Sequence, residues 1–229
     1  MNVSSFLDLL YPPLCIGCSV PVLVDRCDPL SWLCAICRQP WERALVSSHI
    51  NGVRHSYLAD YRPSVREVIL RAKEENDRAA RRILTHAISV GLESLKLTSQ
   101  YFVIAIPSSG AANRIRGYSH GDLLATTVGK EVGAPVVQEA LTEVRKVRDQ
   151  AGLSARDRAT NVANSFALSR VARNIASPVV VIDDVVTTGS SMREALRALA
   201  AADIPVLALI SAVGTGWQRG ADEPSFGIR

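Results

Sequence analysis

The chain has 229 residues, of which 48% are hydrophobic and 21% charged, with a formal net charge of +4. This length allows one sizeable core with a small appendage, and the composition is that of an ordinary globular protein without internal repeats or low-complexity segments. The mild positive charge suits a phosphate-bearing ligand and is weak evidence for a nucleic-acid partner. The longest apolar runs, such as Val179–Ile182, are far shorter than the ~20 residues that span a bilayer.

The N-terminus, residues 1–5, lacks the positively charged region of a signal peptide. All five cysteines fall within the first 37 residues, which is a local arrangement unlike the dispersed spacing of a disulfide framework. A reduced compartment is the better interpretation, so the sequence predicts a cytoplasmic protein.

Residues 1–45 are predicted to form a small unit. An apolar lead-in is followed by Tyr11-Pro12-Pro13, which ends any helix, and then by two Cys-x-x-Cys pairs separated by fifteen residues. This spacing is typical of a tetrahedral Zn²⁺ site with four thiolate ligands. The predicted ligands are Cys15, Cys18, Cys34 and Cys37. Such a site supplies most of the folding energy of a segment too small to bury a core.

Four protein ligands leave no open position on the metal, which favours a structural role over catalysis. Cys27 lies between the pairs and is predicted to be spare. The alternative is a set of buried or redox-active cysteines.

The rest of the chain begins with residues 46–61, whose alternating positions predict a strand. Helices are expected over 63–71 and 77–95, the second capped by Asn76 or Asp77. From residue 100 onward strands and helices alternate. The expected strands cover 101–106, 135–137, 179–182 and 206–210, and the expected helices cover 119–132, 155–161 and 190–202. This order predicts an α/β fold, with a parallel sheet, helices on both faces, and ligands beyond the carboxyl ends of the strands.

The most informative segment carries Asp183 and Asp184 directly after a buried strand and continues into the turn Thr187–Ser191. Two adjacent carboxylates at a strand end suit the vicinal hydroxyls of a ribose. The turn supplies backbone N–H groups, hydroxyls and one glycine at a helix start, where the dipole favours a phosphomonoester. Ser191-x-x-Glu194 has the pattern of a capping box. The alternative is an ordinary strand–turn–helix with solvated acids.

Two further segments are candidates for binding pyrophosphate. Pro107 and Ser108 follow a strand, and Arg114 and Arg116 lie shortly after them beside a glycine, which favours a pyrophosphate clamp. Two solvated arginines before a helix are the alternative. Residues 145–153, which include Lys146, are interpreted as a cover that closes on the diphosphate, with a plain solvated loop as the alternative.

The segment 179–191 closely resembles the thirteen-residue signature with which type I phosphoribosyltransferases bind phosphoribosyl pyrophosphate (PRPP). In that family the two acids bond the ribose hydroxyls and the hydroxyl-rich loop holds the 5-phosphate. By matching position, the resemblance implies a ribose-binding, catalytic role for the acids. It implies PRPP binding by Asp183, Asp184, Val185, Val186, Thr187, Thr188, Gly189, Ser190 and Ser191.

Other features extend the resemblance over residues 11–212. They are the double Cys-x-x-Cys, Tyr61 with Lys73, Arg116-Gly117-Tyr118, and scattered positions from Arg145 to Phe166. Together they look like the ComF family of phosphoribosyltransferase-like proteins, which implies a type I phosphoribosyltransferase-like parallel sheet with flanking helices, preceded by a small zinc-binding unit with four cysteine ligands. Members of this family are associated with DNA uptake in natural competence or with sugar-acid utilisation.

The chain departs from the family at one position that matters for ligand recognition. The family pattern usually has Arg-Gly-Phe-Asn-Gln where this chain has Arg116-Gly117-Tyr118-Ser119-His120, which changes the hydrogen-bond inventory and leaves base recognition without support. His120 is interpreted as a surface residue that opens a helix, with a catalytic role as the alternative.

The leading hypothesis is an enzyme in which Mg²⁺-bound PRPP reacts at C1 with an unknown nucleophile and pyrophosphate leaves. The second is a non-catalytic module that binds PRPP or a ribose 5-phosphate-type ligand and docks a partner protein through the zinc unit. The third is an accessory protein of DNA uptake, although residues 11–45 are not a basic cluster. The expected units are 1–45 (zinc), 46–213 (phosphoribosyltransferase-like) and 214–229 (a disordered tail), and the sequence is silent on the acceptor and the oligomeric state.

Overall fold

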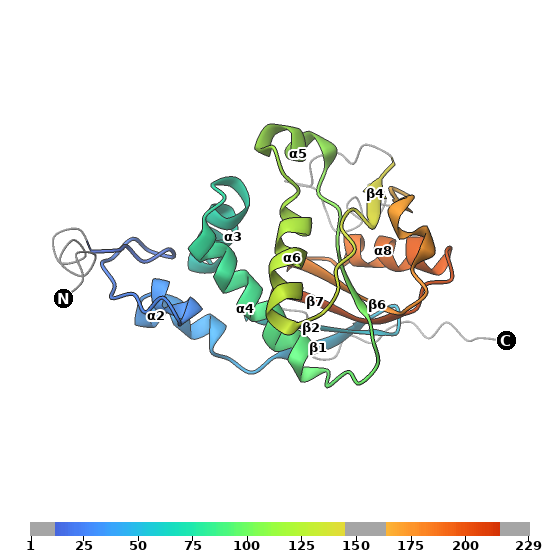
Figure 1. The fold of residues 1–229 in the computed structure, drawn as a ribbon. Coiled ribbons are helices and arrows are strands. Elements are labelled where there is room, and N and C mark those ends of the chain that lie inside the picture. The colour runs from blue at the N-terminus through green and yellow to red at the C-terminus, as the bar shows by residue number, and fades with distance from the viewer. Residues whose placement is uncertain (1–11, 145–163, 216–229) are drawn as a thin grey trace.

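The computed structural model describes residues 12–144 and 164–215 and places them around a five-stranded sheet with the order β1-β2-β7-β6-β3 (Figure 1). The strands are β1 (Val46–Ile50), β2 (Val53–Asp60), β3 (Phe102–Ala105), β6 (Val179–Val186) and β7 (Val206–Gly214). β1 pairs antiparallel with β2, and the other neighbours are parallel. The predicted α/β fold with a parallel sheet is therefore confirmed.

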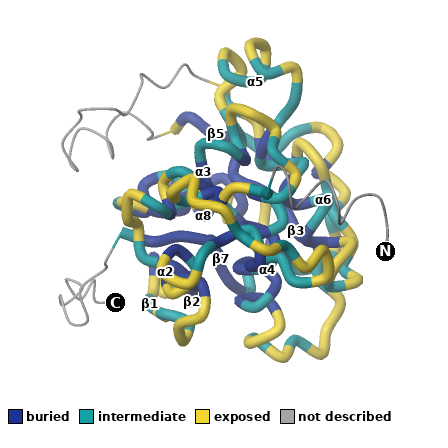
Figure 2. Tube along the Cα trace, turned by 90° about the vertical axis from the view of Figure 1, so that its left-hand side faces the viewer, coloured by how far each residue is buried: buried dark blue, intermediate teal, exposed yellow. Residues whose placement is uncertain are grey.

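Helices cover both faces of the sheet, because successive side chains of each central strand point to opposite sides. The helices of one face are α3 (Pro63–Glu74), α4 (Arg78–Ser94) and α6 (His120–Val132), and α8 (Ser190–Ala200) packs on the other. In β6, Val180 and Ile182 join the core beneath the first set, whereas Val179 and Val181 join the core beneath α8. The central strands are consequently buried on both sides (Figure 2).

The N-terminal unit packs directly onto the first of these cores. It contains η1 (Pro29–Trp32), α2 (Ala35–Arg38) and η2 (Gln39–Trp41). Leu30, Leu33 and Trp41 are buried and belong to the same apolar cluster as residues of α3 and α4. The Arg82 guanidinium of α4 also donates to the carbonyl of Arg26 at 2.7 Å. The apolar core therefore runs across the predicted boundary between the N-terminal unit and the rest of the chain at residue 45.

Several local predictions are wrong. Residues 46–61 form a hairpin instead of one strand, because Asn51 and Gly52 adopt positive φ angles of 49° and 76° and turn the chain. The expected strand 135–137 reduces to a single bridge between Val136 and Val103. The expected helix 155–161 and residues 216–229 of the expected tail lie outside the described residues, whereas Gly214, at the start of that expected tail, belongs to β7.

Other elements were not predicted. The helix α5 (Gly110–Arg116) and the small sheet of β4 (Leu141–Glu143) with β5 (Phe166–Leu168) lie between the expected segments, and η3 (Val171–Asn174) follows them. These pieces are too short to show a hydrophobic period. Within the described ranges, no helix has the length and apolar character needed to cross a bilayer.

Candidate functional site

Asp183 and Asp184 lie inside β6, which continues to Val186 instead of ending at residue 182 as predicted. Asp183 is in register with Ser211 of β7, so its backbone is held by the sheet. Because side chains alternate along a strand, Asp184 points to the face covered by α3 and α6, and Asp183 points to the other face. The two carboxylates therefore meet different surroundings although they are adjacent in sequence.

Two cavities meet at these acids. The larger has a volume of about 280 Å³ and the smaller one about 160 Å³. Asp183, Val185 and Ser191 line both of them, whereas Asp184 lines only the larger. Such an arrangement can receive a ligand with an anionic group at each end and a hydroxyl-bearing ring between them.

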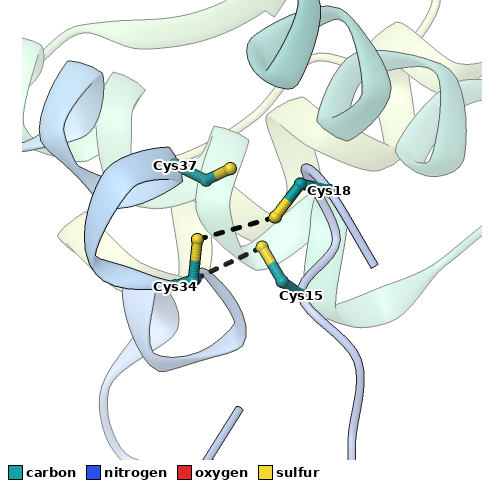
Figure 3. A group of neighbouring side chains, drawn as sticks. All are labelled: Cys15, Cys18, Cys34 and Cys37. Carbon is teal, nitrogen blue, oxygen red and sulfur yellow. Dashed lines mark hydrogen bonds between the residues drawn. The ribbon is translucent and has the colours of Figure 1, made fainter. Parts of the chain in front are cut away.

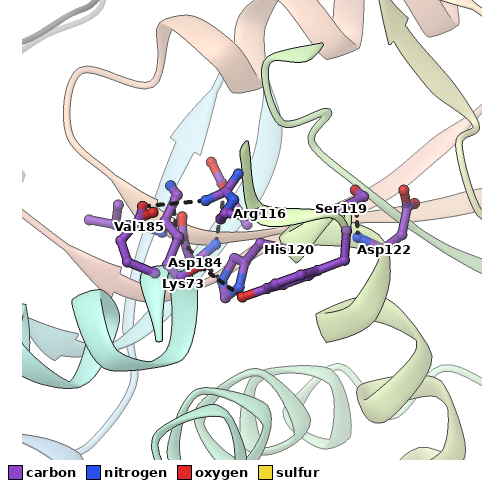
Figure 4. Close-up of polar contacts among 10 residues, drawn as sticks. Lys73, Arg116, Ser119, His120, Asp122, Asp184 and Val185 are labelled. Carbon is purple, nitrogen blue, oxygen red and sulfur yellow. Dashed lines mark hydrogen bonds and ion pairs between the residues drawn. The ribbon is translucent and has the colours of Figure 1, made fainter. Parts of the chain in front are cut away.

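The larger cavity has a charged wall built from distant parts of the chain (Figure 4). Lys73 Nζ from α3 lies 3.3 Å from Asp184 Oδ2, and His120 Nε2 from the start of α6 lies 3.5 Å from the same oxygen. Arg116 from α5 reaches Glu74 at 3.4 Å, and its side chain is only 4% exposed. Nε and Nη2 of Arg116 have no hydrogen-bond partner among the described residues.

Proton affinities in this cluster follow from burial and charge. Burial disfavours the Asp184 carboxylate, but Lys73 and His120 outweigh it and lower the pKa of Asp184 to about 2. Burial, together with the Asp184 charge, raises the pKa of Asp183. Asp184 in turn raises the pKa of Lys73, whereas burial lowers the pKa of His120. At neutral pH the cavity therefore presents a carboxylate, an ammonium and a neutral imidazole.

The interpretation of His120 as a surface residue is wrong. Its side chain is 3% exposed, and neither ring nitrogen has a hydrogen-bond partner in the described structure. Ser119 caps α6 by accepting a hydrogen bond from the backbone N–H of Asp122, and the next residue, His120, is buried. Lys73 was named only as a feature of the family resemblance and was given no role in the site, because the local sequence of α3 contains no motif that places this lysine at the cavity.

The smaller cavity is formed by the turn from Thr187 to Ser191 and the start of α8. Gly189 takes the N-cap position with φ of 72°, which explains why glycine stands there. The hydroxyls of Thr188 and Ser190 lie 2.8 Å apart. Backbone N–H groups, hydroxyls and the helix dipole together make this a site for an anion.

The predicted capping box is wrong, because Glu194 does not reach back to the start of α8. Its carboxylate accepts a hydrogen bond from the backbone N–H of Phe166 at 3.0 Å and pairs with Arg197 at 2.7 Å. Glu194 therefore joins α8 to β5.

The residues predicted to bind pyrophosphate are only partly brought together. Pro107, Ser108 and Arg116 line the larger cavity, together with Ser109. Arg114 is exposed on α5 and is not among the residues that line this cavity. Lys146 lies outside the described residues.

The four predicted zinc ligands form one cluster (Figure 3). Their sulfur atoms all lie within 4.8 Å of one another, and those of Cys18 and Cys34 are 3.6 Å apart. Sulfur atoms bound to one tetrahedral Zn²⁺ are roughly 3.8 Å apart, so the donor set fits this ion. Gly17 belongs to the same geometry, because a Cβ there would lie 2.9 Å from Cys37 Sγ. Cys27 is exposed and takes no part in the cluster.

Comparisons with known proteins agree with this geometry. Residues 120–223 match the phosphoribosyl transferase domain family. The chain is 29% identical over 193 residues to DNA utilization protein YhgH of Salmonella typhimurium, covering 81% of this chain and 77% of that protein. It is 32% identical over 141 residues to competence protein F of Haemophilus influenzae, covering 59% of this chain and 61% of that protein.

Solved structures of adenine phosphoribosyltransferases are also similar. The one from Saccharomyces cerevisiae is 14% identical, has a TM-score of 0.43, and covers 80% of this chain and 91% of its own. The one from Trypanosoma brucei is 12% identical, has a TM-score of 0.43, and covers 81% and 95%.

The parallel sheet, the acids on β6 and the hydroxyl-rich turn before α8 define a phosphoribosyltransferase-like protein of type I. The cysteine cluster in front of this fold and the similarity to relatives named for competence and DNA utilization support the resemblance to the ComF family.

Proposed function

We propose that this chain binds PRPP and transfers its phosphoribosyl group to an acceptor nucleophile with release of pyrophosphate. The observation that carries the proposal is the pair of cavities joined at Asp183, one at a helix N-terminus rich in hydroxyls and one with a cationic wall. PRPP has the matching shape, with a phosphate at C5, a diphosphate at C1 and a ribose between them.

The proposed binding scheme follows the two cavities. The 5-phosphate lies in the turn Thr187–Ser191, and the ribose hydroxyls meet Asp183 and Asp184. The diphosphate extends into the larger cavity toward Pro107, Ser108 and Arg116. Arg114 and Lys146 remain candidates for a contact with pyrophosphate that the described cavity does not include.

Mg²⁺ fits this scheme with few protein ligands. It prefers oxygen ligands and gives up water reluctantly, so it is held mainly by ligand oxygens and water, with the acids on β6 as the protein carboxylates nearby. When bound, it neutralises charge on the diphosphate. Zn²⁺ has a separate, structural role in the cysteine cluster.

Catalysis in this scheme consists of orientation and charge stabilisation. The reaction at C1 has an oxocarbenium-like character, so the residues on β6 act by fixing the ribose, and Arg116 acts on the negative charge of the leaving diphosphate. C1 forms a bond to the acceptor as the bond to the diphosphate oxygen breaks, and the acceptor proton is released to solvent.

Calorimetric titration of PRPP into the zinc-loaded protein tests binding, with and without Mg²⁺. For the folded double variant Asp183→Asn/Asp184→Asn we expect a loss of roughly 100-fold or more in affinity, since both carboxyl groups that accept from the ribose hydroxyls are replaced by amides. Glu131→Gln, an exposed neutralisation on α6, is the matched control and should bind like the wild type. Equal affinities of the double variant and the wild type would remove the assignment of the ribose site.

Turnover is tested separately, by product formation from PRPP and a panel of nucleobases and other nucleophiles. A second candidate function is a regulatory module that binds PRPP without catalysis. The observation that favours it is the burial of both ring nitrogens of His120, which lines the larger cavity. Saturable binding with no product from any acceptor would support it.

The names of the relatives, which refer to competence and DNA utilization, support a proposal about the process in which this chain acts. We propose a cytoplasmic role in the use or uptake of DNA, carried out through the phosphoribosyl ligand. A protein partner could meet the zinc unit, where Leu23 and Ile36 are 94% and 76% exposed. Gel-shift titrations with single-stranded DNA over a range of salt concentrations separate direct DNA binding from an indirect role.

A further inference from the structure

Lys73 differs from the other charged groups on the wall of the larger cavity. Its side chain is 34% exposed, whereas those of Arg116 and His120 are 4% and 3% exposed. Of the cations that line this cavity in the described chain, Lys73 is thus the one that an incoming ligand reaches with least rearrangement. Its ammonium is free to exchange the Asp184 oxygen, 3.3 Å away, for an oxygen of a ligand.

Tyr118 holds the turn of α3 that carries this lysine. The last carbonyl groups of a helix have no partner within the helix. The Tyr118 hydroxyl, from the loop between α5 and α6, donates to the Lys73 carbonyl at 2.8 Å. Arg116, at the end of α5, contacts Glu74 of the same turn. Two contacts therefore tie the end of α3 to the segment that leads into α6.

The position of Lys73 relative to the acids determines which part of a ligand it meets. The smaller cavity is shared with Asp183 and does not include Lys73. A ligand whose phosphate occupies the smaller cavity and whose ribose lies on the acids therefore directs its C1 substituent toward the cavity that Lys73 lines.

We propose that Lys73 contacts the C1 diphosphate of the bound ligand and that Tyr118 is its positioning residue. This assignment rests on the proposed function. It adds a cation from α3, which lies outside the two segments that the sequence analysis proposed for pyrophosphate binding. In the reaction, the electron pair of the broken C1–O bond leaves with the diphosphate, and the Lys73 ammonium neutralises part of that charge. At the Asp184 carboxylate, the ribose hydroxyls take the place of the Lys73 ammonium.

Two ligands separate this role from mere support of Asp184. PRPP and ribose 5-phosphate share the ribose and the 5-phosphate, and only PRPP carries the diphosphate. For Lys73→Met we expect PRPP to bind roughly 10- to 100-fold more weakly, the range of one charge-assisted contact, and ribose 5-phosphate to change by less than about threefold. Lys130→Met, on the exposed side of α6, is the matched control and should leave both affinities unchanged.

Tyr118→Phe removes one hydroxyl and keeps the ring. We expect a smaller shift of the same kind, about threefold in PRPP affinity with ribose 5-phosphate unaffected, because the carbonyl of Lys73 loses its partner while the charge remains. Lys73→Arg serves as a second variant in case Lys73→Met does not fold, and it should retain most of the preference for PRPP.

The outcomes are distinct. Equal weakening of both ligands in Lys73→Met shows that the lysine supports only Asp184 and overturns the assignment, as does unchanged PRPP affinity. If the wild type binds ribose 5-phosphate and PRPP equally well, the diphosphate has no cationic contact and the inference fails while the site remains. If the wild type binds neither ligand, the proposed function itself fails, and the assignment of Lys73 with it.

Discussion

The cysteine cluster and the ligand cavity are built in opposite ways. The four thiols come from residues 15–37, and their sulfur atoms close on one another within 4.8 Å. The charged side chains of the cavity come from α3, α5, α6 and β6. Two of them, Lys73 and Asp184, are 111 residues apart in the sequence. A closed site that satisfies its own ligands can be encoded locally, whereas an open site that must receive a ligand depends on the whole fold.

Removal of the metal is expected to have the largest effect, and it tests whether the two regions are energetically independent. We expect chelation of Zn²⁺, or Cys37→Ser, to lower the free energy of unfolding of the whole chain by several kcal/mol, because metal binding is coupled to folding. The loss should extend past residue 45, since Leu30, Leu33 and Trp41 are part of the core under α3 and α4. Urea unfolding followed by circular dichroism, together with zinc content, measures it.

The control is Cys27→Ser, at an exposed cysteine outside the cluster, for which we expect a change within about 0.5 kcal/mol. If chelation disorders only the N-terminal unit and PRPP still binds with unchanged affinity, the shared core has no energetic consequence. The two regions would then be independent as well as differently built.

The same contrast explains what the sequence could predict. The spacing of the cysteines and the acids next to a hydroxyl-rich turn are local patterns, so the members of the thiol cluster and the position of the turn before α8 were predicted from the sequence. The starts of β6 and β7 and the bounds of α4 and α6 were also expected close to where they are observed, with a clear cap such as Asp77 for α4, whereas both strands continue four residues past their predicted ends.

What was missed depends on contacts between distant segments. Lys73 and His120 become parts of the cavity only because α3 and α6 pack on the same face of the sheet as Asp184. Glu194 fits the capping-box pattern, yet a buried partner on β5 takes its carboxylate. Tertiary contacts overrode the local pattern at these positions, and no spacing rule contains them.

Lowering the pH tests the stability of the sheet that carries the cavity. His55 of β2 is fully buried, with Nε2 3.0 Å from the hydroxyl of Ser211, the residue in register with Asp183. Burial lowers the pKa of His55 to about 4. The unfolded chain, with a pKa near 6.5, takes up this proton first as the pH falls, so stability decreases between about pH 6.5 and 4, by roughly 3 kcal/mol in total.

Urea unfolding at several pH values measures this slope. In His55→Asn the part of the slope due to His55 should disappear, whereas exposed His49→Asn should keep it. A difference between wild type and variant is needed because thiolate ligands also take up protons in acid and release their metal. Parallel curves for His55→Asn and the wild type would show that this imidazole is not the origin of the acid sensitivity.

Glu194→Gln should have the smallest effect, and it tests how the open site is scaffolded. Burial opposes the charge of Glu194, but the ion pair with Arg197 and backbone N–H groups lower its pKa, so its contribution to stability is present at neutral pH and is lost as the pH falls through the folded pKa. The amide keeps the shape and weakens the charged contacts, which predicts a loss of about 1 kcal/mol at pH 7 and a shallower decline in acid. Exposed Glu93→Gln is the control, and thermal unfolding measures both.

Because Glu194 and Arg197 both bond Phe166, the Glu194→Gln variant should also weaken phosphate binding at the start of α8, which titration with inorganic phosphate measures. Loss of stability with unchanged phosphate affinity would mean that the turn before α8 is formed by its own local sequence, like the cysteine cluster, and that only the charged wall of the larger cavity depends on distant contacts.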